Sequence, residues 1–288
     1  MRFGRRPVAW RRRSVGFLIE QRDGGRAAFL HPLLCRAVSE GIDSASRRSL
    51  HRAAVALLRS RGARSAELAP HLLLAAAPGD GEAVRELRQA ASEASALGAH
   101  DSAALHLRHA VSLCPPGAER AALLYELGHV HQLAGTQDLA SAAFAQAVAE
   151  PASTVELRCQ AYRSWGFSLT LVGDIETGRD RLSLGIEAAA ACQPALAAEI
   201  AVAAAVLEMT TSGMQRAMQS ARRALDLARA SGEAAALAKA WAVWCNVAFN
   251  QGDPQAYARA KEALDRRRRW RPTRPNSSGA GRCPSPSA

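Results

Sequence analysis

The sequence predicts an all-α fold in which pairs of helices stack into a solenoid. Ala and Leu supply most of the apolar residues, which make up 48% of the 288-residue chain, whereas aromatic residues make up 5%. Such a composition favours helices over strands. From about Leu68 to Leu264, apolar residues recur at helical spacing in segments that glycines separate. We therefore expect neither an all-β sandwich nor a parallel-sheet enzyme.

The segment around Gly128 shows the repeating unit most clearly. Two predicted helices lie on either side of Gly135, and Gly128 provides a small residue in the first of them. The segment resembles the tetratricopeptide pattern of tryptophan, leucine-glycine and tyrosine followed by alanine, phenylalanine, alanine and proline. The matching positions are Leu124, Leu127, Gly128, His131, Ala140, Phe144, Ala147 and Pro151.

The same spacing recurs along the chain. Two antiparallel helices approach closely only where a side chain is small, and the predicted small positions are Ala91, Gly128, Gly166, Val206 and Cys245. A glycine between the helices of each pair is expected to take the left-handed conformation that ends the first helix, at Gly98, Gly135, Gly173, Gly213 and Gly252. Since a single pair cannot bury its apolar face, we expect about five pairs to stack into a right-handed solenoid.

A different pattern precedes the repeats. Two short apolar runs flank Asp23-Gly24-Gly25, which is typical of a β-hairpin. A predicted helix opens at Pro32, a second one starts near Ser46, and Gly62 follows as a stop. A hairpin beside small helices is typical of a winged-helix module. The predicted organisation is a basic unstructured arm at 1–13, a partial winged-helix remnant at 14–66, tetratricopeptide-like repeats at 67–265 and a disordered Arg/Pro-rich tail at 266–288.

Positive charge is concentrated at the two ends of the chain. Residues 1–13 hold six Arg and residues 266–288 hold seven, with no acid in either segment. Together they exceed the net charge of +11, so the residues between them are slightly acidic. A nucleic-acid-binding domain would carry its basic residues on a folded face. We therefore expect nucleic acid to bind only weakly through the Arg-rich ends, if it binds.

No catalytic or metal-binding set emerges from the sequence. A phosphate-binding loop needs Gly-Lys-Ser/Thr, and neither Lys239 nor Lys261 follows a glycine. The histidine pairs His106/His109 and His129/His131 lack the further ligands that a metal site requires. We expect no catalytic residue, no metal, no cofactor and no enzymatic activity. For Trp241 and Trp244, three residues apart, both core packing and an aromatic anchor on the inner surface remain open.

The sequence also predicts a cytoplasmic protein without a membrane span. The longest apolar run, at 200–207, is far shorter than the about 20 residues that cross a bilayer. The apolar stretch at 15–19 is too short for a signal peptide. The six cysteines contain no Cys-x-x-Cys pair, and we expect reduced, buried thiols.

The segment from Phe29 to Val38 contains a more specific motif. It reads Phe-Leu-His-Pro-Leu-Leu-Cys-Arg-Ala-Val and resembles the F-x-H-P-L-x-x-x-A-V signature of large ATP-binding LuxR-type, MalT-like transcriptional regulators of actinobacteria. Residues 47–54 are similar to the next helix of that family, and residues 68–80 are similar to its linker into the repeats. The resemblance covers roughly Gly16 to Leu264.

This resemblance implies an architecture and one candidate residue. In that family an ATPase module ends in a winged helix, a tetratricopeptide-like sensor follows, and a helix-turn-helix closes the chain. His31 matches the family's histidine that contacts bound nucleotide. This chain has no Walker A or Walker B motif and no DNA-binding domain, so we expect it to be a truncated or frameshifted fragment of such a regulator.

The predicted function is binding without catalysis. The inner face of the solenoid is expected to engage a protein segment or a small effector, as the sensor of a LuxR-type regulator does, although the sequence identifies none of the contacting residues. One alternative is a transcription regulator that acts through partner subunits, with ATP or ADP bound in the intact family architecture. A second alternative, from another class, is an ATP-hydrolysing switch.

Overall fold

The structure is a computed structural model that describes residues 18–21, 26–29, 32–211 and 213–269. The chain divides into two compact units, Met1–Ala63 and Arg64–Ala288. Each unit is described separately below. The predicted N-terminal arm at 1–13, His31 and the tail beyond residue 269 lie outside the described residues.

The first unit contains the predicted hairpin and the two predicted helices. Strands β1 (Leu18–Gln21) and β2 (Arg26–Phe29) pair antiparallel. Helices α1 (Pro32–Gly41) and α2 (Ser44–Ser60) follow. The side chain of Asp43 accepts hydrogen bonds from the first backbone N–H groups of α2, so this helix begins slightly before the predicted start at Ser46.

These elements have the order of a winged helix, but the described part of the unit contains little buried apolar surface. Leu33, Val38, Leu50 and Leu57 are each more than half exposed, and Val55 is buried. Helix α1 contacts β2. The predicted hairpin and helices are therefore present, in the order of a winged helix.

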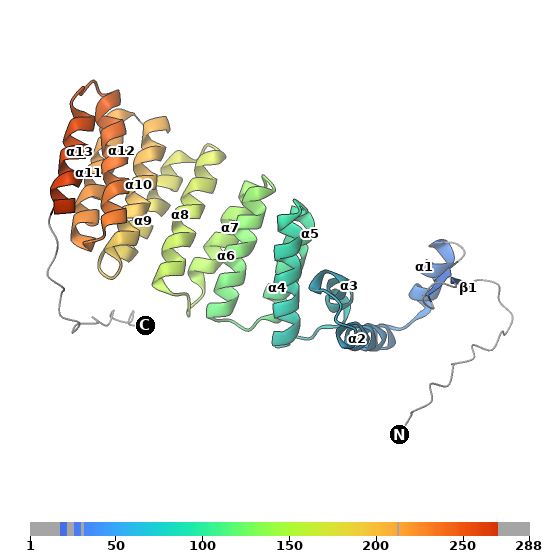
Figure 1. Ribbon diagram of the computed structural model, residues 1–288. Helices are drawn as coiled ribbons and strands as arrows, with labels where there is room; N and C mark the ends of the chain where they lie inside the picture. Colours follow the sequence, from blue (N-terminus) through green and yellow to red (C-terminus); the bar gives the residue numbers. More distant parts are fainter. Residues whose placement is uncertain (1–17, 22–25, 30–31, 212, 270–288) are drawn as a thin grey trace, which may run out of the picture. The chain divides into compact units, whose positions relative to one another are not determined.

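The second unit is an all-α helical-repeat solenoid, as predicted. Figure 1 shows its helices side by side in chain order. Helix α3 packs on α4, the first helix of five pairs, and the second helix of each pair from α5 to α11 also contacts the first helix of the next pair. The helices of this unit are α3 (Ser65–Ala75), α4 (Gly81–Ala96), α5 (His100–Leu113), α6 (Ala118–Leu133), α7 (Gln137–Ala149), α8 (Val155–Leu171), α9 (Ile175–Ala190), α10 (Pro194–Thr211), α11 (Met214–Ser231), α12 (Ala234–Asn250) and α13 (Ala256–Arg269).

The turn within each pair is built on glycine. The five predicted glycines all have positive φ, between +76° at Gly98 and +96° at Gly213. Side chains other than glycine rarely adopt this conformation, which ends the first helix and redirects the chain. At the third pair, Asp174 follows the glycine and caps α9 by accepting a hydrogen bond from the backbone N–H of Thr177. The predicted turns are confirmed.

Close helix approach within two of the pairs depends on glycine. A Cβ added at Gly128 would lie 2.5 Å from Cε1 of Phe144 on the facing helix. A Cβ at Gly166 would lie 2.7 Å from the carbonyl oxygen of Gly178. Neither separation is possible for real atoms, so the spacing of α6 from α7 and of α8 from α9 requires glycine at these positions.

The predicted small position in the fourth pair is wrong by one residue. Val206 is 51% exposed, whereas its neighbour Ala205 is fully buried against Ala217 and Ala221 of α11. In the fifth pair, Cys245 is only half-buried. The Ala-rich sequence of α10 contains several small residues in a row, so its pattern did not identify which one faces α11.

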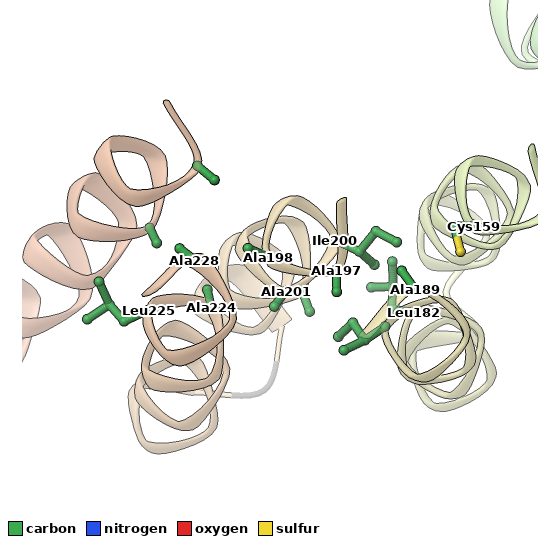
Figure 2. Packing of buried hydrophobic residues seen from close by; sticks show 14 of the residues in the cluster. Cys159, Leu182, Ala189, Ala197, Ala198, Ile200, Ala201, Ala224, Leu225 and Ala228 are labelled. Carbon is green, nitrogen blue, oxygen red and sulfur yellow. The ribbon is translucent and has the colours of Figure 1, made fainter. Parts of the chain in front are cut away.

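The apolar core runs through the stack between successive pairs. Figure 2 shows part of it, in which Ile200, Ala197 and Ala201 of α10 lie between Leu182 and Ala189 of α9 and Ala224 and Leu225 of α11. Burial raises the pKa of the Cys159 thiol in this cluster to about 11, so the thiol stays protonated. Cys192 is engaged in a disulfide, and the expectation of exclusively reduced cysteines is therefore wrong at that position.

Three details add to the sequence analysis. Residues 68–73, which resemble the regulator family's linker, lie in helix α3, which contains Pro70 in its interior. Helix α13 extends to Arg269, so residues 266–269 of the predicted tail are helical. Helix α10 is long and apolar enough to cross a membrane by length and composition. Since it packs against α8, α9, α11 and α12, we interpret it as a core helix of the solenoid.

The close approach at Gly128 gives a first prediction. Gly128→Ala should lower the free energy of unfolding, because the added methyl group displaces the Phe144 ring. Overpacking costs about 1–3 kcal/mol, which outweighs the about 1 kcal/mol that alanine gains over glycine in helix propensity. Chemical denaturation followed by circular dichroism measures the change.

The matched control is Gly81→Ala in the first turn of α4. A Cβ at Gly81 meets its nearest atom, Nη1 of Arg85, at an ordinary 3.7 Å. This variant should be as stable as the native chain or more so. Equal stability of the two variants would show that the α6–α7 spacing does not depend on Gly128.

Candidate binding groove on the first helices

The first helices of the pairs form the inner side of the stack from α6 onward. Helix α6 contacts α8, α8 contacts α10, and α10 contacts α12, whereas contacts among α7, α9, α11 and α13 are weaker. Helices that lie closer together line the inside of a curved array, and the second helices spread apart on the outside. Binding surfaces of helical-repeat proteins are formed by this inner side.

Two adjoining hollows lie along the first helices and share His129. One, of about 690 Å³, lies mainly between α4 and α6. The other, of about 320 Å³, lies among α6, α8 and α10. Together they form one groove, which we call the inner groove. Its charged, polar and bulky apolar lining residues are Arg85, Arg88, Gln89, Ser92, Glu126, His129, Gln132, Leu133, Arg163, Ser164, Phe167 and Leu207.

The inner groove carries an excess of positive charge. Nε of Arg88 lies 3.0 Å from both carboxylate oxygens of Glu126, so these two charges neutralise each other across α4 and α6. Arg85 and Arg163 pair with no carboxylate in the part of the chain that the structure describes. Two guanidinium groups therefore remain available to an anionic ligand.

Hydrogen bonds between neighbouring first helices fix one wall of the groove. Nε2 of Gln132 on α6 donates to the carbonyl oxygen of Ser164 at 3.0 Å and to Oγ of Ser168 at 2.8 Å, both on α8. Beside this bridge, Leu133 and Phe167 are exposed by 64% and 56%. The groove thus has polar groups that hydrogen bonds hold in place, next to exposed apolar side chains. Such a surface can bind a peptide segment that carries both polar and apolar side chains.

His129 lies at the junction of the two hollows. Its ring makes edge contacts with Tyr125 and Phe144, at centroid distances of 4.5 and 5.4 Å. Burial lowers the pKa of His129, and the positive charge of Arg163 lowers it further. The ring is therefore mainly neutral near pH 7, and the arginines supply the positive charge of the groove.

The other histidines have structural surroundings. His131 is buried, and its Nδ1 lies 2.9 Å from Oγ1 of Thr136, the residue that precedes α7. His106 and His109 each have one buried ring nitrogen without a hydrogen-bond partner. Among the residues that the structure describes, no three His, Cys, Asp or Glu side chains come together in a metal-binding group. His31, the candidate nucleotide contact, lies outside the described residues.

The two tryptophans pack against each other. The rings of Trp241 and Trp244 make an edge contact at 5.2 Å, and both are partly buried on the core cluster between α10 and α12. Core packing, one of the two readings of the sequence, accounts for both side chains. Trp241 also reaches a separate hollow on the last helix pair.

Solved structures with the same fold are known. Crystal structures of BtubC (BKLC) from P. vanneervenii and of a Podosopora anserina putative kinesin light chain with nearly identical TPR-like repeats are similar to this chain. The first is 17% identical, with a TM-score of 0.53, over 84% of this chain and 97% of its own. The second is 15% identical, with a TM-score of 0.51, over 64% of this chain and 93% of its own. These likenesses show a TPR-like helical-repeat fold.

Comparison of the amino-acid sequence with known proteins does not assign the chain to a family. No protein-family model matches the chain, and no curated protein is significantly similar to it.

The sequence analysis identified none of the groove residues, although a signal was present. Arg88 and Glu126 are 38 residues apart, and the bridging pair Lys239 and Glu199 is 40 apart, which is close to one repeat. Complementary side chains at this spacing lie on neighbouring first helices. A search for such pairs would have located the side of the solenoid that carries the groove.

The surroundings of His129 give a second prediction. Its NMR titration midpoint should lie below the ordinary value of 6.5, because burial and Arg163 both disfavour the charged ring. Arg163→Gln should raise the midpoint part of the way, since the burial remains. Arg85→Gln is the control and should leave it unchanged. An unaltered midpoint in Arg163→Gln would contradict the proposed contact.

Proposed function

We propose that this chain is a binding module that holds an acidic, extended protein segment in the inner groove. The observation that carries the proposal is the charge of the groove: Arg88 is neutralised by Glu126, while Arg85 and Arg163 have no carboxylate partner in the described residues. Guanidinium groups bind carboxylates through charge-assisted, often bidentate, hydrogen bonds.

The shape and the remaining groups of the groove support a peptide in particular. The two hollows follow one another along four first helices, α4, α6, α8 and α10, which suits a chain lying across them. Gln89 and Ser92 offer hydrogen bonds to a peptide backbone, and Leu133 and Phe167 offer apolar contacts to its side chains. A segment that combines carboxylates with an apolar residue would use all of these groups.

We also propose, from the sequence resemblance, that this module is the sensor region of a LuxR-type ATP-binding regulator. The motif at 29–38 and its place before the repeats support this origin. On this proposal, occupation of the groove would report the presence of a partner to the rest of the regulator, and the chain itself would carry no catalysis. An ATP- or ADP-dependent regulator that acts through partner subunits is the alternative.

Peptide binding gives the third prediction. A fluorescein-labelled peptide containing glutamates and one leucine should bind the full chain, with an affinity that falls as salt increases, because the attraction is electrostatic. The same peptide with lysines in place of glutamates should not bind. Arg163→Gln and Arg85→Gln should each weaken binding by about tenfold, since loss of one charged hydrogen bond costs about 1.5–3 kcal/mol. Fluorescence anisotropy measures the affinities.

Arg222→Gln is the matched control for charge. Arg222 is exposed on α11 and does not line the groove, so its loss removes the same net charge elsewhere. An equal loss of affinity in this variant would show non-specific attraction and contradict the proposal. Tighter binding of a single-stranded oligonucleotide than of the acidic peptide would favour a nucleic-acid ligand instead.

The regulator proposal is tested separately. The nucleotide sequence on both sides of the reading frame should encode an ATPase module before the motif at 29–38 and a helix-turn-helix after the repeats. A titration with ATP tests the alternative, because saturable micromolar binding by this chain would favour a nucleotide-dependent regulator.

A further inference from the structure

The last described helix pair carries a large apolar hollow. It measures about 950 Å³ and lies between α12 and α13. Trp241, Cys245 and Phe249 of α12 line it on one side, and Tyr257 and Ala260 of α13 line it on the other. Phe249 and Tyr257 are exposed by 67% and 71%, which is unusual for large aromatic side chains so close together.

The position of the hollow in the stack explains its exposure. Within the solenoid, the face of each pair is covered by the pair that follows: α10 packs on α8, and α12 packs on α10. Among the described elements, α12 and α13 contact α10, α11 and each other. Among the described residues no further helix pair packs on α12 and α13, and the faces of a repeat stack are either covered or polar.

We propose that a second copy of this chain covers this face, so that two solenoids associate end to end about a two-fold axis. This inference uses a surface separate from the inner groove and does not depend on the proposed function. In a two-fold interface the same patch serves both partners, and each residue pair occurs twice. Phe249 and Tyr257 of each copy would enter the hollow of the other and place four aromatic rings at the centre.

Charges on α13 support a second copy as the occupant. Lys261 and Asp265 both line the hollow and lie four residues apart, on one face of the helix. Neither forms an ion pair among the described residues. When two such helices run antiparallel, Lys261 of one copy lies opposite Asp265 of the other, and the reverse pair forms as well.

The same charges disfavour the Arg-rich tail of this chain as the occupant. Residues 266–288 hold seven Arg and no acid, and Lys261 and Asp265 leave the hollow without net charge. A purely basic segment finds only the Asp265 carboxylate there, which the charge of Lys261 offsets, whereas a copy of the same face is complementary to itself.

Sedimentation equilibrium of the full chain, from low to high micromolar concentration, tests the proposal. The native chain should form a dimer. Phe249→Glu and Tyr257→Glu should each raise the dimer dissociation constant by at least about tenfold, because a charge would enter an apolar centre. Leu97→Glu is the matched control: Leu97 is 85% exposed in the turn between α4 and α5, and its loss should leave the dimer intact.

A charge exchange provides a second test that leaves the aromatic residues in place. Lys261→Glu alone and Asp265→Lys alone should each weaken the dimer, since like charges then face each other twice. An equimolar mixture of the two variants should restore it, because the mixed dimer has two opposite-charge pairs. An ion pair within one helix could not produce this rescue.

Three results would overturn the proposal. The first is a native chain that stays monomeric throughout the concentration range. The second is a dimer that Phe249→Glu and Tyr257→Glu leave unchanged, which would place the interface elsewhere. The third is a mixture of the two charge variants that associates no better than either alone.

Discussion

The close approach of the two helices within a pair is the constraint on which the rest of the structure depends. At the second pair the ring of Phe144 occupies the space that a side chain at residue 128 would need, and at the third pair Gly166 and Gly178 bring two backbones into contact. A pair held this tightly behaves as one thin layer with an apolar face on each side. Layers of similar thickness can stack regularly, and regular stacking brings the first helices close enough to form a continuous groove.

Much of this arrangement could be predicted from the sequence because it depends on local chemistry. A left-handed turn selects glycine at its own position, and all five predicted turn glycines have positive φ. The sequence did not show which residues of α10 face the neighbouring helix α11. Ala203, Ala204 and Ala205 are equally small, so periodicity did not show that Ala205 faces α11. Pro70 lies inside α3, between the buried side chains of Leu68 and Leu72.

The inner groove could not be predicted in the same way, because it belongs to no single helix. Arg88 and Glu126 meet only after two pairs have stacked, and so do Gln132 and Ser168. Both helices of a pair have one apolar and one polar side, and the sequence does not tell which helix lies on the inside. That choice is made by contacts between first helices, which depend on the curvature of the whole stack.

The burial of one charged side chain on α10, that of Glu208, illustrates how such a stack keeps its register. The Ala-rich faces of α10 provide apolar area, but their short side chains interlock little with a neighbouring helix. Sliding α10 along that helix would therefore cost little free energy. Glu208 interrupts this surface: its side chain is 6% exposed, and Oε1 accepts a hydrogen bond from Nε of Arg179 on α9 at 2.9 Å. A shift of α10 along α9 would leave this carboxylate buried without its partner, which is far more costly than lost alanine contacts. We interpret the pair as the element that fixes α10, and with it the adjoining wall of the inner groove at Leu207, in one position.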